Sequence, residues 1–130
     1  MPAYDATAFN PPAPVARVVL RDPLSGQSII DVPMLIDSGA DVTLLPRSSV
    51  ESVGVDAAIG EEYELTAFDG TTSVSRAVNI HLLFLGRTFR GRFLTMDSGF
   101  GVLGRDILNH LSILHSGPML EWSVLHLRGK

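Results

Sequence analysis

The sequence predicts an all-β fold, a small barrel or sandwich of many short strands with one short helix. Short β-branched runs recur along the chain, turn dipeptides such as Asp69-Gly70 separate them, and one short stretch has helical spacing. At 130 residues with 45% hydrophobic content, one domain with a sizeable core is expected. We expect residues 1–14 to form a proline-rich N-terminal arm and residues 15–130 to form that domain.

The first predicted hairpin joins residues 15–20 to residues 28–32, because both runs are extended in character and Asp22 to Gly26 between them is typical of a turn. The second run leads directly into Met34-Leu35-Ile36-Asp37. Residues 46–58 are small and polar, and for them we expect a loop with about one turn of helix at most.

Asp69-Gly70 is the strongest local hairpin signal, since this dipeptide suits the positive φ values of a two-residue turn. The one short helix is predicted at residues 107–111, where apolar side chains recur at i, i+1 and i+4. The remaining predicted extended segments are 63–68, 71–78, 79–85, 88–96 and 120–127.

Composition excludes several functional classes. The net charge is −4 and the ten Lys and Arg residues are scattered, so nucleic acid is not an expected partner. There is no cysteine, and the four histidines lack the spacing of zinc ligands, so we expect no disulfide, no metal and no cofactor. No signal peptide and no run of eighteen apolar residues is present, which predicts a soluble domain without membrane contact, cytoplasmic or of undetermined location.

Asp37-Ser38-Gly39 carries the chemical signal. It lies between two apolar runs, Met34 to Ile36 and Val42 to Leu45, which predicts a partly buried carboxylate. Buried carboxylates that lie close together share one proton, so that one can activate water while the other protonates a carbonyl oxygen. The alternative is a strand-ending turn in which the carboxylate caps its own backbone. Because the chain offers no second copy in the same context, the chemistry implies a homodimer.

Two further patterns compete with this interpretation. Asp97-Ser98-Gly99 repeats the tripeptide, but Phe100-Gly101 follows in place of Ala-Asp, so we interpret it as a turn. The segment from Gly99 to Gly104 matches a dinucleotide-binding pattern with Glu121 downstream, but only 26 residues remain after Gly104, too few for the rest of a doubly wound sheet.

Two motifs together resemble the retroviral-type (retropepsin-like) aspartic proteases, specifically their bacterial relatives. The first is Leu35-Ile36-Asp37-Ser38-Gly39-Ala40-Asp41 with Thr43-Leu44-Leu45-Pro46 after it. The second runs from Gly101 to Asn109 and contains Gly104-Arg105-Asp106. The resemblance covers most of the chain and implies a closed or partly open small β-barrel with a β-hairpin flap and one short C-terminal helix.

The resemblance also implies residue roles. Asp37 would be the catalytic aspartate, Ser38 and Gly39 would support the active-site loop, and Ala40 and Asp41 would contact substrate. Asp41 would pair with Arg105, and Arg105 and Asp106 would support the structure and the dimer. The hairpin around Phe68, Asp69 and Gly70 would be the flap that closes over peptide.

The expected function is therefore a homodimeric aspartic endopeptidase without a cofactor, acting on a peptide or protein substrate. A second hypothesis comes from another class: a dimerisation or peptide-binding module of the same fold with little turnover. It is motivated by Ser38 where Thr is usual, by a flap with few glycines and by a tail from Gly117 to Lys130 that is longer than in the viral enzymes.

Overall fold

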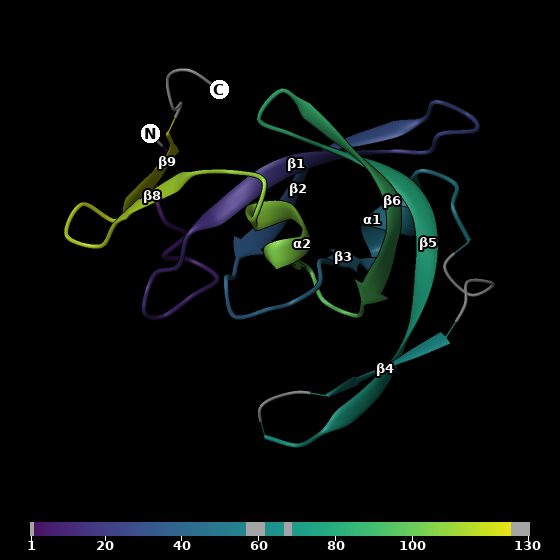
Figure 1. Cartoon of the computed structure of the whole chain (residues 1–130), viewed down its shortest axis with the longest axis horizontal. Helices are drawn as coiled ribbons and strands as arrows, with labels where there is room; N and C mark the ends of the chain where they lie inside the picture. The colour runs from purple at the N-terminus through teal and green to yellow at the C-terminus, as the bar shows by residue number, and fades with distance from the viewer. Residues whose placement is uncertain (1, 57–61, 67–68, 126–130) are drawn as a thin grey trace.

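The structure is a computed structural model that describes residues 2–56, 62–66 and 69–125, and within these ranges it forms a barrel with two projecting hairpins (Figure 1). The elements, in chain order, are β1 (Val15–Arg21), β2 (Ser28–Ile36), β3 (Leu44–Pro46), α1 (Arg47–Ser52), β4 (Glu62–Thr66), β5 (Thr72–Phe84), β6 (Arg87–Met96), β7 (Gly101–Leu103), α2 (Arg105–Leu108), β8 (Ile113–Ser116) and β9 (Glu121–Val124).

The barrel is closed by strands β1, β2, β7, β3, β6 and β5 in that hydrogen-bonded order, with β5 pairing back onto β1. Two pairs are parallel, β2 with β7 and β3 with β6, and the other barrel pairs are antiparallel. Closure leaves the barrel itself without a free edge. The predicted all-β small barrel is therefore confirmed.

The core follows from the alternation of side chains along the strands. In β1, Val18 and Leu20 are buried while Arg17 is exposed, because successive residues of a strand face opposite sides of the sheet. One side chain of α2, Ile107, completes the interior. The largest fully buried apolar side chains are Leu20, Met34, Leu45, Ile80, Leu82, Leu103 and Ile107.

Residues 71–78 and 79–85, predicted as two strands, form the single strand β5, so the predicted break between them is wrong. No glycine or proline interrupts this stretch, which lets one strand continue. The first part of β5 pairs with β4 outside the barrel, and the second part pairs with β6 and β1. The projecting β4–β5 hairpin is thus an extension of a barrel strand (Figure 1).

The helices differ from expectation in their bounds. α2 begins at Arg105, two residues before the predicted start, and hydrogen-bonded turns continue it to Leu111, whose backbone N–H donates to the Leu108 carbonyl at 3.0 Å. α1 occupies six residues of the segment predicted as a loop with about one turn of helix, so the helix there is longer than expected. Within the described ranges, no helix has the length and apolar character needed to cross a membrane.

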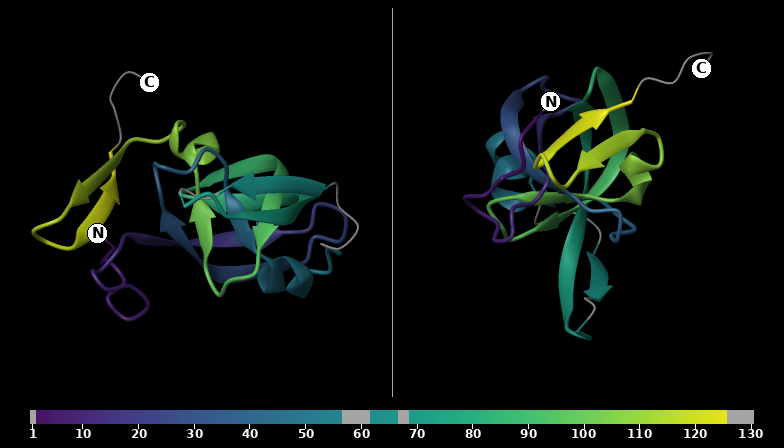
Figure 2. Two further views of the ribbon diagram at one scale, coloured as in Figure 1. Left: turned by 90° about the horizontal axis from the view of Figure 1, so that it is seen from below. Right: turned by 90° about the vertical axis from the view of Figure 1, so that its left-hand side faces the viewer.

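Strands β8 and β9 form a second hairpin, which lies beside the N-terminal residues at one end of the molecule (Figure 2). Residues 2–4 extend along β9: the Tyr4 N–H donates to the Leu120 carbonyl at 2.7 Å and the Trp122 N–H to the Pro2 carbonyl at 3.0 Å. Trp122 anchors the hairpin, because its buried indole donates to the Val15 carbonyl at 3.3 Å. The proline-rich arm therefore packs against the tail of its own chain.

Candidate active site

Asp37 is the first residue after β2, and the end of β7 holds it in place. Its backbone N–H donates to the Leu103 carbonyl at 3.1 Å, which continues the parallel β2–β7 pairing by one residue. The chain then turns, since the Ala40 N–H donates to the Asp37 carbonyl at 3.2 Å. The Asp37 side chain is half-buried, between the buried barrel end at Ile36 and the exposed loop that follows.

One carboxylate oxygen of Asp37 is oriented by the loop itself. The Gly39 N–H donates to Oδ1 at 2.9 Å, and within the described chain Oδ2 has no protein donor. A Cβ added at Gly39 would lie 3.1 Å from Oδ1, a tight contact that would push the carboxylate away. Ser38 and Gly39 are both exposed, so the loop that follows Asp37 lies at the surface of the described chain.

Arg105 connects the second motif to the first through backbone carbonyls. Its backbone N–H donates to the Ala40 carbonyl at 2.8 Å, and its guanidinium Nη1 donates to the Ser38 carbonyl at 2.8 Å. The expected Asp41–Arg105 ion pair is not formed among the residues that the structure describes; Asp41 is exposed. Arg105 therefore supports the loop by binding its main chain.

Asp106 supports the loop from the other side. Its carboxylate accepts the Thr43 hydroxyl at 2.6 Å on Oδ1 and the Thr43 N–H at 3.1 Å on Oδ2. The same hydroxyl oxygen accepts the Gly104 N–H at 3.0 Å. Thr43 is 1% exposed, so its hydroxyl would be an uncompensated polar group without these bonds. In the sequence, Thr43 is distinguished only as a polar residue within the apolar run Val42 to Leu45.

Gly101 and Gly104 have a packing role that accounts for glycine at these two positions. A Cβ at Gly104 would lie 2.5 Å from the carbonyl carbon and oxygen of Val42, and one at Gly101 would lie 2.4 Å from the Leu44 carbonyl oxygen. These backbone approaches occur where β7 and the start of α2 cross the chain that leaves the Asp37 loop. The crossing keeps both motifs at one site.

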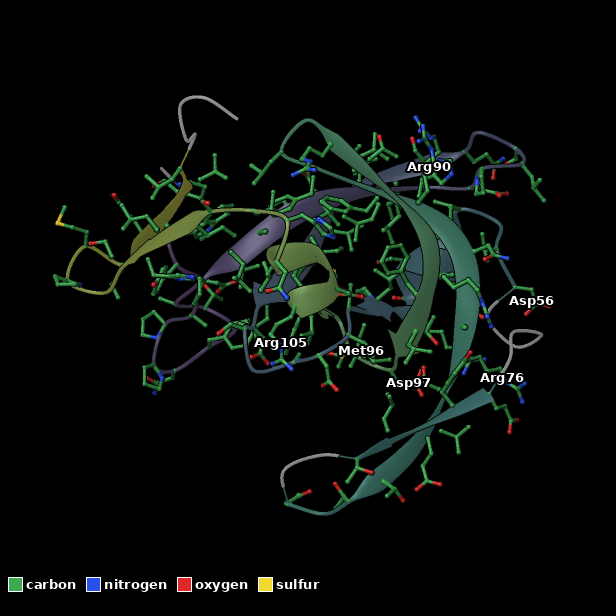
Figure 3. The ribbon with its side chains drawn as sticks, viewed as in Figure 1. Asp56, Arg76, Arg90, Met96, Asp97 and Arg105 are labelled. Carbon is green, nitrogen blue, oxygen red and sulfur yellow. The ribbon has the colours of Figure 1, made fainter. Side chains whose placement is uncertain are left out.

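The predicted flap lies on the β4–β5 hairpin. Phe68 lies outside the described residues, whereas Asp69 and Gly70 are exposed and Gly70 has a φ of +86°. The Asp69 carboxylate accepts the Thr71 hydroxyl at 2.6 Å and the Thr71 N–H at 2.9 Å, and these two bonds lower the pKa of Asp69. Figure 3 shows Arg105, Met96 and Asp97 on the side of the barrel that faces this hairpin.

Asp97 differs from Asp37 in its surroundings. It belongs to the connection between β6 and β7, its side chain is 85% exposed, and its carboxylate lies 3.9 Å from the Arg47 guanidinium. Among the described residues, no N–H donates to the Asp97 carboxylate in the way that the Gly39 N–H donates to that of Asp37. Across residues 2–56, 62–66 and 69–125, there is no cluster of three or more His, Cys, Asp or Glu side chains that could hold a metal ion.

No protein-family model and no curated protein matches the sequence. Among solved structures, the chain is similar to EIAV protease complexed with the inhibitor HBY-793, with a TM-score of 0.52 and 24% identity over 75% of this chain and 86% of that chain. The similarity concerns the fold, and the narrower placement in a bacterial branch stays a prediction. The chain therefore has the retropepsin-like barrel fold of a retroviral aspartic protease.

Proposed function

We propose that this protein is a homodimeric aspartic endopeptidase whose active site combines Asp37 from two copies of the chain. The observation that carries the proposal is the Asp37 loop: a half-buried carboxylate with one oxygen held by Gly39 and the other open, supported on two sides by Arg105 and Asp106. The likeness to a retroviral protease supports the same interpretation at the level of the fold.

Each Asp37 would have a distinct part in the reaction. Two carboxylates a few ångströms apart hold one proton between them, because double ionisation is costly. The ionised Asp37 removes a proton from water as the water attacks the peptide carbonyl, and the protonated Asp37 donates to the carbonyl oxygen. Proton transfer to the departing amine then completes hydrolysis. The Gly39 N–H fixes the carboxylate orientation that this exchange needs.

A single chain holds only half of such a site, so a second copy must dock. Apolar side chains on the terminal β8–β9 hairpin offer a surface for it: Leu114 is 45% exposed, Met119 66% and Leu125 47%. Exposed apolar groups gathered in this way favour association. The N-terminal arm pairs with β9 of its own chain, which supports an interface built differently from one of interleaved termini.

Peptide cleavage is the direct test. The full chain and its Asp37→Asn variant are incubated with a denatured protein across acidic to neutral pH, with and without a pepstatin-like transition-state mimic. We expect cleavage that the mimic suppresses and that Asp37→Asn abolishes. Asp97→Asn, the same substitution in the other Asp-Ser-Gly tripeptide, is the matched control and should cleave normally. Full activity of Asp37→Asn would contradict the proposal, and peptide binding without cleavage at any pH would favour a binding module.

A further inference from the structure

Positive charge is concentrated on three neighbouring barrel strands. β1, β5 and β6 contain no Asp or Glu, although the whole chain has 14 acidic residues against ten Lys and Arg and a net charge of −4. The arginines on these strands are Arg17, Arg21, Arg76, Arg87, Arg90 and Arg92.

Three side chains of these strands form a row across the outer face of the barrel, called here the basic row: Arg21 on β1, His81 on β5 and Arg90 on β6. Arg21 is directly opposite His81, and His81 is directly opposite Arg90. Leu20 and Leu82, the adjacent pair, are both 0% exposed, so the basic row faces outward. The Arg21 guanidinium lies 3.5 Å from Nδ1 of His81.

The basic row has no ion-pair partner among the described residues, whereas three neighbouring arginines have identified partners of different kinds. Arg76 is paired with Glu62, Arg87 donates to the His110 carbonyl at 2.7 Å, and Arg92 lies over the Tyr63 ring. Neither Arg21 nor Arg90 forms an ion pair with any residue in the described ranges. Arg21 and Arg90, on the two strands that flank β5, therefore produce a local positive potential that attracts anionic groups.

We propose that the basic row is an exosite, a second binding surface away from the active site, for an acidic segment of the polypeptide substrate. The inference rests on the proposed peptidase function. Val19 and Leu83, the half-buried pair in the adjacent outward row, give apolar contacts that a polypeptide can use. A long polyanion such as nucleic acid would meet the net negative charge of the rest of the molecule, so a short acidic segment fits better.

The position of the basic row sets a minimum length for the substrate segment between the acidic residues and the cleaved bond. Figure 3 shows Arg90 on the side of the barrel away from Arg105 and Asp97. From Arg90 to Met96 the strand β6 spans roughly 20 Å, given about 3.3 Å per residue. An acidic segment bound at the row must therefore be joined to the cleaved bond by at least about six extended residues.

The test measures binding on the full-length Asp37→Asn variant, so that cleavage does not interfere. The probe is a fluorescein-labelled peptide that contains consecutive glutamates, and its anisotropy is followed at low ionic strength. Replacing both Arg21 and Arg90 by Gln should weaken binding about ten-fold, and added salt should weaken binding to the parent protein. The single variants Arg21→Gln and Arg90→Gln are compared with Arg47→Gln on α1, which also removes one positive charge and should bind as the parent does. Thermal unfolding of each variant checks that it is folded.

A charge-reversed variant sharpens the test. Arg21→Glu combined with Arg90→Glu should prefer a peptide of consecutive lysines over the glutamate peptide. The exosite would be overturned if the parent bound a glutamine peptide as tightly as the glutamate peptide. A loss of affinity in Arg47→Gln equal to that in the variants of the basic row would also overturn it. Tighter binding of a single-stranded oligonucleotide through Arg21 and Arg90 would overturn the polypeptide assignment. If the glutamate peptide binds as expected but the native chain cleaves nothing, the binding surface stands and the peptidase proposal fails.

Discussion

At the scale of single residues, Thr43 has the most demanding environment near the candidate site. Its hydroxyl donates to Asp106 and accepts from Gly104 while its side chain is almost fully enclosed. Replacing the hydroxyl by a methyl group leaves a carboxylate oxygen and a buried N–H without partners. The residue thus couples the chain after the Asp37 loop to the start of α2.

Thr43→Val should lower the free energy of unfolding by about 2 kcal/mol, because it removes one hydrogen bond to a charged group and leaves a buried donor unsatisfied. Urea unfolding followed by circular dichroism measures the change. Thr88→Val, the same substitution at an exposed position of β6, is the control and should have little effect. An equal loss of unfolding free energy in Thr43→Val and Thr88→Val would show that Thr43 has no special role.

Asp69 gives a prediction about pH. The Thr71 hydroxyl and N–H lower its pKa from 3.8, so the ionised form stabilises the folded hairpin. That stabilisation is fully present above the unfolded pKa and is lost as the pH falls through the folded one. Nuclear magnetic resonance titration should find the pKa of Asp69 below 3.8 in the parent protein and closer to 3.8 in Thr71→Val. An unchanged titration of Asp69 in that variant would contradict the assignment.

At the scale of elements, the crossing of β7 over the chain after the Asp37 loop depends on two glycines. Gly104→Ala should destabilise the fold by about 3 kcal/mol or more, because the new Cβ would meet the backbone of Val42, which cannot move as a side chain can. Gly99→Ala is the control, since a Cβ there meets nothing within 4 Å. Thermal unfolding distinguishes them, and equal melting temperatures would refute the close approach.

The sequence predicted the elements that local patterns determine. The extended runs of β1, β2 and β6 follow from their β-branched residues. A hairpin at Asp69-Gly70 was also predicted, but the two-residue turn was wrong, because Thr66 pairs with Thr72 and the connection is therefore longer. The three-residue strands β3 and β7 could not be recognised, because such short segments become strands only through partners distant in sequence, such as Leu44 opposite Val102.

For the candidate site, the sequence predicted the position of the catalytic candidate but not the hydrogen-bond partners around it. The position of Asp37 follows from its flanking apolar runs, and the two motifs do meet. The partners within the site did not follow from the sequence: Arg105 binds the Ser38 carbonyl instead of Asp41, and Asp106 binds Thr43. Main-chain acceptors leave no trace in a sequence, so a side-chain pairing was the only one that residue types could suggest.

At the scale of the whole molecule, the proposed active site needs Asp37 from two chains. Dimers that contain one Asp37→Asn chain should therefore be inactive. Wild-type protein and its Asp37→Asn variant are unfolded together in urea, refolded together and assayed for peptide cleavage. If each active site needs Asp37 from both chains, mixed dimers lack one of the two carboxylates and cannot share a proton. The mixture contains about four variant chains per wild-type chain, so random pairing leaves about one wild-type chain in five with a wild-type partner. Activity should therefore fall about five-fold. The reference is the same amount of wild-type chain refolded with an inert protein. Activity that tracks the amount of wild-type chain alone would show that one Asp37 is enough, and the dimeric mechanism would be wrong.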